Sequence, residues 1–332
     1  MAATIDDVAA RAGLSTATVS RALRDLPNVS AAAKARVLQA AKELDYVITP
    51  TASRLATGRT RAIGVVTPYL GTWFFGQALS GVERVLRAKY DVLLYALPDA
   101  AVQQDFFARM PLRRRVDGVV LLAVSLDGDQ QDALRSLDLP MVSVGDPLAE
   151  SFSVGIDDEG AARTATNHLI SLGHSRIAMI GDAASRFGTP RRRRRGFLGA
   201  MRSAGLATPV RYEVDGGYTV AGGASAMAEL LSLPQPPTAV FAQSDEMAAG
   251  ALQAMRRLGL RCPEDVSIVG FDDHELAAAL DLTTMAQPAQ QRGEVAASRL
   301  LTALADGSAT TGAGRELART RLVVRSSTGP PG

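Results

Sequence analysis

The sequence predicts a small all-α headpiece followed by a larger α/β body of two lobes. Two patterns indicate this division. The first 45 residues show helical spacing and helix caps without a strand-like run, whereas from Ile63 onward short runs of Val, Ile and Leu alternate with helical stretches. The length of 332 residues agrees, because domains of ~100 to 200 residues give two or three domains.

Composition excludes several classes of protein. Hydrophobic residues make up 47% and charged residues 21%, close to the globular average, so each domain can bury a core. Cys262 is the one cysteine, which excludes an intrachain disulfide and multi-cysteine metal sites and fits a reducing compartment. No apolar run approaches the ~18 residues of a membrane helix, and the start lacks an export signal. We therefore expect a soluble cytoplasmic protein.

The charge is unevenly distributed. The net charge is +2, but residues 1 to 60 carry eight Arg or Lys against five Asp or Glu, which gives +3 there and −1 in the remainder. A basic head on a nearly neutral body suits a polyanionic partner, although +3 alone is weak support.

The headpiece is predicted to hold three helices. Thr4 with Asp7 forms a capping box, Gly13 ends the first helix, and Ser15 and Ser30 cap the second and third. Two helices joined by a tight turn and braced by a third are the helix-turn-helix arrangement. The inward positions are Ile5, Val8, Ala9 and Ala12, then Val19 and Leu23, then Val37, Leu38, Ala41 and Leu44.

The outward face of the second helix carries small, hydroxyl and guanidinium side chains without an acid, which suits entry into a major groove. Arg21 can reach a guanine with two hydrogen bonds, Thr16 and Ala17 can touch base edges, and Ser15 and Thr18 can donate to phosphates. The alternative is an ordinary polar helix surface. The face consists of Thr16, Ala17, Ser20, Arg21 and Arg24.

The body is predicted to contain two doubly wound parallel sheets, because its strands are nearly continuous in Val, Ile and Leu and so are buried on both faces. Strand-helix units recur on either side of Asp157, which indicates two similar lobes with a cleft at the carboxyl ends of the strands. The strand candidates are Ile63–Val66, Val92–Leu97, Val116–Val124, Met141–Val144, Val154–Ile156, Ile177–Ile180, Ala239–Phe241 and Val266–Phe271.

A polar linker, Thr49–Arg61, joins head and body around one apolar residue, Leu55. By itself it is at most marginally helical.

These motifs together resemble the LacI/GalR family of bacterial transcription regulators. The resemblance covers nearly the whole chain in a consistent order. It is carried by Thr4-Ile5-Asp6-Asp7-Val8-Ala9-Ala10-Arg11-Ala12-Gly13-Leu14-Ser15, Thr18-Val19-Ser20-Arg21-Ala22-Leu23, Thr57-Gly58-Arg59-Thr60, Gly173-His174, Asp245-Glu246-Met247-Ala248, Pro263-Glu264-Asp265-Val266-Ser267-Ile268-Val269-Gly270-Phe271-Asp272-Asp273 and Leu282-Thr283-Thr284.

The resemblance implies a body like periplasmic sugar-binding proteins, divided as 1–47 head, 48–61 hinge, 62–157 with 287–319 as the N-terminal lobe, and 158–286 with 320–328 as the C-terminal lobe. It also implies that a hinge helix forms on operator DNA and wedges Leu55 into the minor groove. Packing on the head, or no role, are the alternatives for Leu55. The implied DNA-binding residues are Thr4, Ser15, Thr16, Ala17, Thr18, Ser20, Arg21, Asn28, Ser53, Leu55 and Ala56.

Five arginines, Arg191 to Arg195, follow Pro190, which suits the first turn of a helix. They point around more than a full turn, so they cannot all serve one site. A solvated face is favoured over a second nucleic-acid patch. Counting back from Gly196 in the family register, Arg193 is expected to enter the cleft, with Arg191 as the nearest competitor.

The remaining cleft candidates combine aromatic rings with carboxylates, which suits a polyhydroxylated ring such as a sugar. Relatives usually have Asn-Pro at Thr72-Trp73, an arginine near Asp146 and Asn at Ser244, so the effector's identity stays open. Trp73 and Phe74 could instead be core residues. These candidates are Tyr69, Thr72, Trp73, Phe74, Asp146, Asp158, Tyr218, Ser244, Asp245 and Asp272.

Features of an enzyme are lacking in the sequence. His168, His174 and His274 lie on different predicted elements without metal-ligand spacing, and no phosphate loop, nucleophile elbow or dinucleotide motif occurs. No metal or cofactor is predicted. A solute-binding protein of a transporter would need an export signal and no basic head.

The sequence therefore predicts a homodimeric transcription regulator, expected to be a repressor, that binds a near-palindromic operator. A small-molecule effector, expected to be a carbohydrate, would bind between the lobes and change DNA affinity through lobe closure and the hinge.

Overall fold

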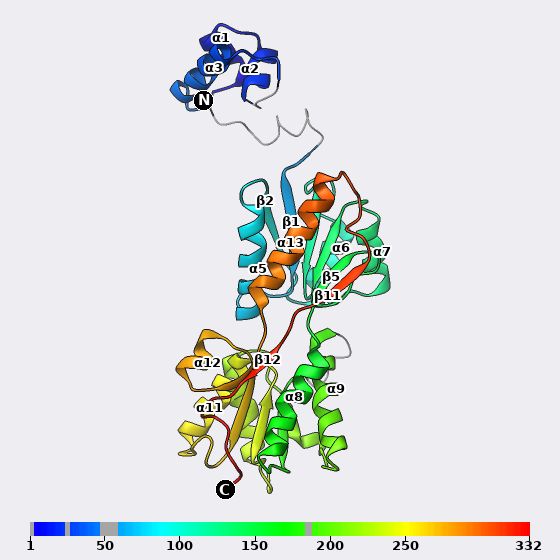
Figure 1. Cartoon of the computed structure of the whole chain (residues 1–332), viewed down its shortest axis with the longest axis vertical. Coiled ribbons are helices and arrows are strands. Elements are labelled where there is room, and N and C mark those ends of the chain that lie inside the picture. The colour runs from blue at the N-terminus through cyan, green and yellow to red at the C-terminus, as the bar shows by residue number, and fades with distance from the viewer. Residues whose placement is uncertain (1–2, 24–26, 47–58, 183–187) are drawn as a thin grey trace. The chain divides into compact units, whose positions relative to one another are not determined.

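The computed structural model describes residues 3–23, 27–46, 59–182 and 188–332. The chain forms two compact units, residues 1–60 and 61–332. Figure 1 shows the described helices α1, α2 and α3 in the first unit and two α/β lobes in the second. In the described part of the chain, no helix has both the length and the apolar character needed to span a membrane.

The head contains α1 (Ile5–Ala12), α2 (Thr16–Leu23) and α3 (Ala31–Glu43). The predicted capping box is present, since Thr4 and Asp7 exchange hydrogen bonds, and Gly13 ends α1 in the left-handed conformation at φ 62°. The amide of Thr18 donates to Ser15 Oγ at 3.2 Å. The helix-turn-helix arrangement is confirmed.

The head core gathers one face of each helix around Val8, Val19 and Val37, all fully buried. One predicted core position is wrong, because Leu38 is 50% exposed. The buried face of α3 follows Val37 at helical spacing through Ala40 and Ala41, and Leu38 lies about 100° away from that face.

The first lobe is built on a six-stranded sheet in the order β11-β5-β4-β3-β1-β2, in which every pair is parallel. Figure 1 shows α5 and α13 together on one face of this sheet. The strands are β1 (Ala62–Thr67), β2 (Asp91–Ala96), β3 (Gly118–Leu122), β4 (Met141–Val144), β5 (Phe152–Gly155) and β11 (Gly314–Leu317), and the helices are α5 (Trp73–Leu86), α6 (Ala100–Arg109), α7 (Gly128–Arg135) and α13 (Ala289–Ala305).

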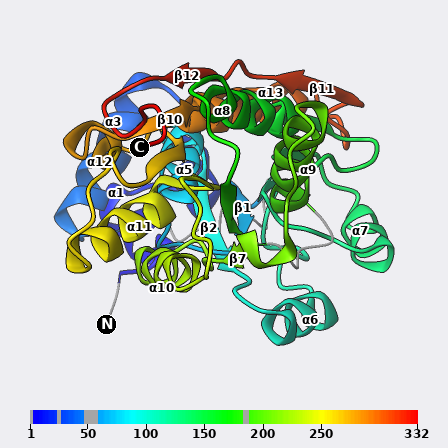
Figure 2. The same ribbon diagram turned by 90° about the horizontal axis from the view of Figure 1, so that it is seen from below.

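The second lobe is built on a sheet in the order β12-β10-β9-β8-β6-β7, parallel except that β12 runs antiparallel to β10. Figure 2 shows α8 and α9 on the opposite side from α10 and α11. The strands are β6 (Ile177–Gly181), β7 (Glu213–Asp215), β8 (Ala239–Ala242), β9 (Ser267–Asp272), β10 (Thr283–Ala286) and β12 (Arg321–Val323), and the helices are α8 (Asp158–Ser171), α9 (Gly188–Ser203), η1 (Val210–Tyr212), α10 (Val220–Leu231), α11 (Asp245–Arg257) and α12 (Glu275–Ala279).

The eight predicted strands all form, and helices cover both faces of each sheet. The two predicted doubly wound sheets are present, and among the described strands β12 at one edge runs antiparallel to its neighbour. β12 is antiparallel because the chain returns along β10 after leaving β11 in the other lobe. The strands that the apolar runs did not indicate, β7, β10, β11 and β12, have three or four residues each.

The chain passes between the lobes three times, after β5, after β10 and after β11 (Figure 1). The two lobes are thus joined by three neighbouring segments, which position the carboxyl ends of both sheets opposite one another.

Glycines hold α5 tightly against α13. A Cβ on Gly81 would lie 2.0 Å from the carbonyl oxygen of Gln290, and one on Gly293 would lie 2.1 Å from that of Ala78. Only glycine permits this approach, so the helix carrying Arg292 is fixed beside the start of α5.

Candidate functional site

The head presents the predicted reading face on α2. Ser15, Thr16, Ala17 and Arg21 are exposed, and the first turn of α2 has no acidic residue. Thr18 and Ser20 are half-buried, while Thr4 and Asn28 are exposed. The described part of this face is therefore open to a partner.

Arg21 is held by a hydrogen bond to Pro27. Its Nη2 donates to the carbonyl oxygen of Pro27 at 2.8 Å, and the residue remains exposed. Asn28, next in the chain, has φ 70°, a conformation that Asn tolerates better than most residues. The predicted residues Ser53, Leu55 and Ala56 lie outside the described residues.

A cavity of about 350 Å³ lies between the lobes of the body. Its wall collects the segments that follow β1, β2, β3 and β4 in the first lobe and β6, β8 and β9 in the second. This is the position at which open α/β sheets bind ligands. Its volume suits a small molecule of about one or two sugar rings.

Nine predicted cleft candidates line this cavity. They are Tyr69, Thr72, Phe74, Asp146, Asp158, Arg193, Tyr218, Ser244 and Asp272. They come from both lobes, so a ligand held by them would contact both.

Trp73 is not part of the cavity wall. Its amide donates to Glu246 Oε1 at 3.1 Å and its indole Nε1 donates to Glu275 Oε2 at 2.9 Å. Its ring packs beside His274, with centroids 5.5 Å apart. The structure thus corrects its assignment, since Trp73 joins the two lobes beside the cavity.

Asp245 is also placed elsewhere, as a buried structural group. Its Oδ1 accepts from Thr284 Oγ1 at 2.7 Å and its Oδ2 accepts from the amide of His274 at 2.8 Å. Burial raises the pKa of this carboxyl, and Asp272 adds to the effect. Both oxygens accept hydrogen bonds from residues of β10 and of the segment after β9, and Asp245 does not line the cavity.

Arg193 forms the polar floor of the cavity and is 4% exposed. Its Nε donates to Asp158 Oδ1 at 3.1 Å, its Nη1 donates to the carbonyl oxygen of Gln243, and its guanidinium lies 3.5 Å from the ring centroid of Phe271. Arg191, by contrast, is exposed. The structure therefore places Arg193, and not Arg191, at the cavity.

Arg194 and Arg195 of the run are paired with acids. Arg194 binds Glu213, and Arg195 binds Glu159 with Nη2 to Oε2 at 2.7 Å. These pairs support a solvated face over a second nucleic-acid patch.

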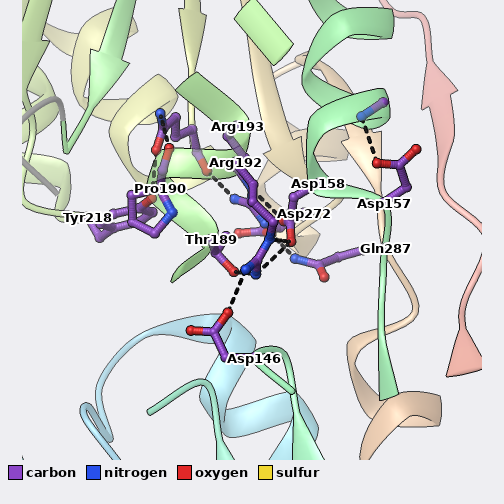
Figure 3. Close-up of polar contacts among 12 residues, drawn as sticks. Asp146, Asp157, Asp158, Thr189, Pro190, Arg192, Arg193, Tyr218, Asp272 and Gln287 are labelled. Carbon is purple, nitrogen blue, oxygen red and sulfur yellow. Dashed lines mark hydrogen bonds and ion pairs between the residues drawn. The ribbon is translucent and has the colours of Figure 1, made fainter. Parts of the chain in front are cut away.

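Arg192 links the two lobes at the edge of the cavity, as Figure 3 shows. Its Nη1 donates to Asp146 Oδ1 at 2.6 Å, its Nε donates to Asp158 Oδ2 at 3.2 Å, and its Nη2 donates to Thr189 Oγ1 at 3.0 Å. Burial opposes its charge, but the carboxylates of Asp158 and Asp146 outweigh burial and raise the pKa of Arg192.

Asp272 has an unusual backbone and an unusual pKa. Its φ of 122° lies in a region that side chains rarely adopt, and such strain is concentrated at functional sites. Burial raises the pKa of Asp272 to about 7, although Arg193 partly offsets this. It accepts a hydrogen bond from Gln287, which in turn accepts one from Arg292 (Figure 3 shows the first bond).

Tyr218 completes the second-lobe side of the cavity. Its hydroxyl donates to Gln243 Oε1 at 2.7 Å, and burial raises its pKa. It therefore remains neutral and orients Gln243 behind Arg193.

Sequence reasoning missed four groups at this site. Arg192 was inside the arginine run but could not be singled out, and Gln243 precedes the predicted Ser244. Gln287 and Arg292 follow β10 without any motif, so no pattern in the sequence indicated them. The groups are Arg192, Gln243, Gln287 and Arg292.

His168 and His174 make structural hydrogen bonds. His168 Nε2 lies 2.9 Å from Thr328 Oγ1, and His174 bonds Thr238 and the carbonyl oxygen of Gly329. In the described ranges, no group of three His, Cys, Asp or Glu could hold a metal ion. Burial raises the pKa of Cys262 to about 12, so its thiol is not a nucleophile at neutral pH.

Together these features define a ligand-responsive DNA-binding protein: a helix-turn-helix head with an open reading face, and a body that encloses a small-molecule cavity between two lobes. Comparisons with known proteins agree. Residues 4–48 match the family described as bacterial regulatory proteins, lacI family, and residues 166–328 match the periplasmic binding protein-like domain.

The chain is 37% identical over 333 residues to the HTH-type transcriptional repressor CytR of Escherichia coli (strain K12), covering 98% of this chain and 96% of that one. It is 35% identical over 306 residues to the ribose operon repressor of the same strain, covering 90% and 92%.

A crystal structure of the lac repressor dimer bound to operator and the anti-inducer ONPF aligns with TM-score 0.85 and 27% identity, covering 99% of this chain and 100% of that one. The CelR-cellobiose complex aligns with TM-score 0.72 and 30% identity, covering 98% and 100%.

The chain belongs to the LacI family of bacterial transcription regulators. It is a DNA-binding transcriptional repressor with a periplasmic-binding-protein-like effector domain. The predicted family, fold class and function are thereby confirmed, as is the prediction that the protein is a regulator and not an enzyme.

Proposed function

We propose that the protein binds a near-palindromic operator as a homodimer and that a carbohydrate or sugar derivative in the cavity controls this binding. The observation that carries the proposal is the cavity wall, where Asp158, Arg193 and Asp272 of one lobe lie opposite Phe74 and Asp146 of the other. Carboxylates accept from sugar hydroxyls, the guanidinium donates to sugar oxygens, and an aromatic face covers the C–H surface.

The head supplies the DNA contacts in this proposal. The exposed side chains of α2, with Arg21 foremost, would read base edges, and Ser15 and Thr18 would bind phosphates. Asn28 lies at the end of the loop that holds Arg21. The predicted hinge residues Ser53, Leu55 and Ala56 would contact the minor groove at the centre of the operator.

Dimer formation and the division of the chain belong to the same proposal. The lac repressor structure is a dimer on operator DNA, and its similarity to this chain covers 99% of the sequence. We propose a head of residues 1–47, a hinge of 48–61, a first lobe of 62–157 with 287–319 and a second lobe of 158–286 with 320–328. β11 belongs to the sheet of the first lobe and β12 to the sheet of the second, which supports a boundary between the lobes at residues 319 and 320. As a regulator of transcription the dimer would act in the cytoplasm, at the nucleoid.

The cavity lies where effector binding can change the angle between the lobes. Arg192 with Asp146, and Trp73 with Glu246, already connect the lobes on its edges. A ligand that binds one lobe arrangement better than the other shifts their populations, and a coupling of about 1 to 3 kcal/mol is typical.

One experiment tests both parts of the proposal. Genomic DNA fragments are selected on the purified full-length protein, with and without a panel of neutral and charged carbohydrates. The proposal predicts enrichment of fragments that share a near-palindrome, and a change in their recovery with at least one sugar. Enrichment without any sugar effect would reject the carbohydrate effector while retaining the DNA-binding function.

A further inference from the structure

Two hydrogen-bonding groups in the cavity wall lack a partner. In the described part of the chain, Thr72 Oγ1 and Arg292 Nε are buried side-chain atoms without a hydrogen-bond partner, and both residues line the cavity. Buried polar groups in folded proteins are nearly always paired. Two unpaired groups on one wall therefore indicate where a ligand supplies acceptors.

Arg292 differs from Arg192 and Arg193 because its hydrogen-bond partner is a neutral side chain and not a carboxylate. It is 3% exposed, and its guanidinium donates to the neutral side chain of Gln287. Arg192 and Arg193 are both paired with carboxylates, but among the described residues no carboxylate lies within ion-pair distance of Arg292. Burial lowers the pKa of Arg292 to about 10, so it remains charged at neutral pH. A buried cation without a counterion is costly, and an anionic ligand removes that cost.

Thr72 stands at the start of α5, beside Arg292. It occupies the N-cap position with extended backbone, yet its side chain makes no capping bond, and the first turn of α5 has no acid. The amino end of this 14-residue helix carries partial positive charge. The Phe74 ring lies 5.0 Å from the Arg292 guanidinium carbon, which brings both donors to the same part of the first lobe.

Burial lowers the pKa of Arg292 more than the acids of the wall raise it: Asp158 and Asp272 favour its charge, but neither forms an ion pair with it. Asp146 and Asp158 bind Arg192 and Arg193, while Asp272 has a pKa near neutrality and accepts from Gln287. The other acids are Asp99, whose Oδ1 caps α6, Asp182 at the end of β6, and Glu246, which accepts from the amide of Trp73. Glu246 shows that a carboxylate is already attracted to the start of α5.

We propose that the effector carries an anionic group, a carboxylate or a phosphate, which accepts from Arg292 Nε and Thr72 Oγ1, while its hydroxyl-bearing part faces Asp158, Arg193 and Asp272. This inference rests on the proposed function, because it specifies which carbohydrates the cavity takes. It names sugar acids and sugar phosphates in preference to neutral sugars.

The test is calorimetric titration of the full-length protein with matched sugars that share a ring: glucose, glucuronate and glucose 6-phosphate, then galactose, galacturonate and galactose 6-phosphate, then ribose and ribose 5-phosphate. In the series that binds, the charged member should bind at least about tenfold more tightly than its neutral parent. Preference for the acid or the phosphate tells the two anionic groups apart.

Variants connect that preference to the residues. In Arg292→Gln the charged ligand should lose about tenfold or more in affinity while the neutral parent changes little, and Thr72→Val should lose less. Arg191→Gln, an exposed arginine on α9, is the matched control and should keep the preference. Thermal melting provides a second measurement, since Arg292→Met removes a buried unpaired charge and should melt no lower than the wild type without ligand.

The outcomes separate this inference from the proposed function. A neutral sugar that binds as tightly as its charged partners, or a charge preference that persists in Arg292→Gln, would overturn the anionic effector and leave a carbohydrate effector standing. Failure of every sugar to bind would overturn the anionic effector together with the carbohydrate effector, and would leave operator binding standing.

Discussion

Arg192 Nη1 donates to Asp146 Oδ1 at 2.6 Å, and this ion pair joins α9 of the second lobe to the segment after β4 of the first (Figure 3). Both side chains are about one-fifth exposed, and the same guanidinium binds Asp158 within its own lobe. The pair therefore connects the two lobes at the edge of the cavity.

A double-mutant cycle on Arg192→Gln and Asp146→Asn tests this connection. We expect a coupling of about 1 kcal/mol in the free energy of effector binding, because the pair is only partly screened by solvent. Calorimetric titration of the four proteins measures it. Arg195→Gln, which breaks the Arg195–Glu159 pair within one lobe, is the control. If the two substitutions change the free energy of effector binding by strictly additive amounts, the Arg192–Asp146 pair does not contribute to effector binding.

Replacement of Arg21 tests how the head reads DNA. Arg21→Ala should lose ~1 to 3 kcal/mol of operator binding, mainly at one G·C position in each half-site. The Pro27 carbonyl takes one donor of the guanidinium, and the exposed remainder can reach a guanine. Fluorescence anisotropy on operators with single base changes measures this. A uniform loss across all sequences would indicate a phosphate contact instead.

Leu55→Ala tests the hinge. An apolar residue in a polar linker has little reason to be there unless it enters the minor groove, so the substitution should weaken specific operator binding. Melting temperature and effector affinity should not change, because Leu55 belongs to neither lobe in the proposed division. Unchanged operator affinity would refute the wedge.

Arg193→Ala and Asp272→Ala test the cavity. Each should abolish the effector response while DNA binding remains, because both side chains line the cavity and neither belongs to the head. The response is the ratio of operator affinities with and without effector. A normal response in both variants would reject the site.

Asp272 also makes stability depend on pH. Its folded pKa of about 7 lies above the ordinary value of 3.8, so the folded state holds the proton more tightly than the unfolded state. Stability contributed by the protonated carboxyl is therefore present at low pH and declines as pH rises from about 4 to about 7. Asp272→Asn should lose that decline relative to the wild type. Urea unfolding across this range checks the difference, and parallel pH curves would contradict it.

Much of the fold was predictable because its local signals are strong. The Thr4 and Asp7 capping box, the Gly13 turn and the apolar runs of the central strands each point to one structure, and all are present. Edge strands such as β11 and β12 were not predictable, since β11 contains no apolar run, β12 contains only a short one at Leu322 and Val323, and both depend on neighbours distant in sequence.

The site was predictable where a residue follows a strand end. Asp146 and Asp272 come directly after buried strands or end them, and both line the cavity. The sequence did not place Trp73 or Arg292 correctly, because both positions depend on long-range packing. Trp73 of the first lobe bonds Glu246 and Glu275 of the second, and Arg292 on α13 packs beside the start of α5 within the first lobe. Such long-range geometry leaves no pattern in one sequence.

The most direct test of the account is operator affinity measured with and without the effector. Anisotropy titrations at fixed, modest ionic strength would use a genomic fragment selected by the protein, random competitor DNA and the carbohydrate panel. We expect binding to the selected fragment to be about 10³-fold or more tighter than to random DNA, and to change by about 5- to 150-fold with one carbohydrate. Equal binding to both DNAs, whatever compound is added, would contradict it.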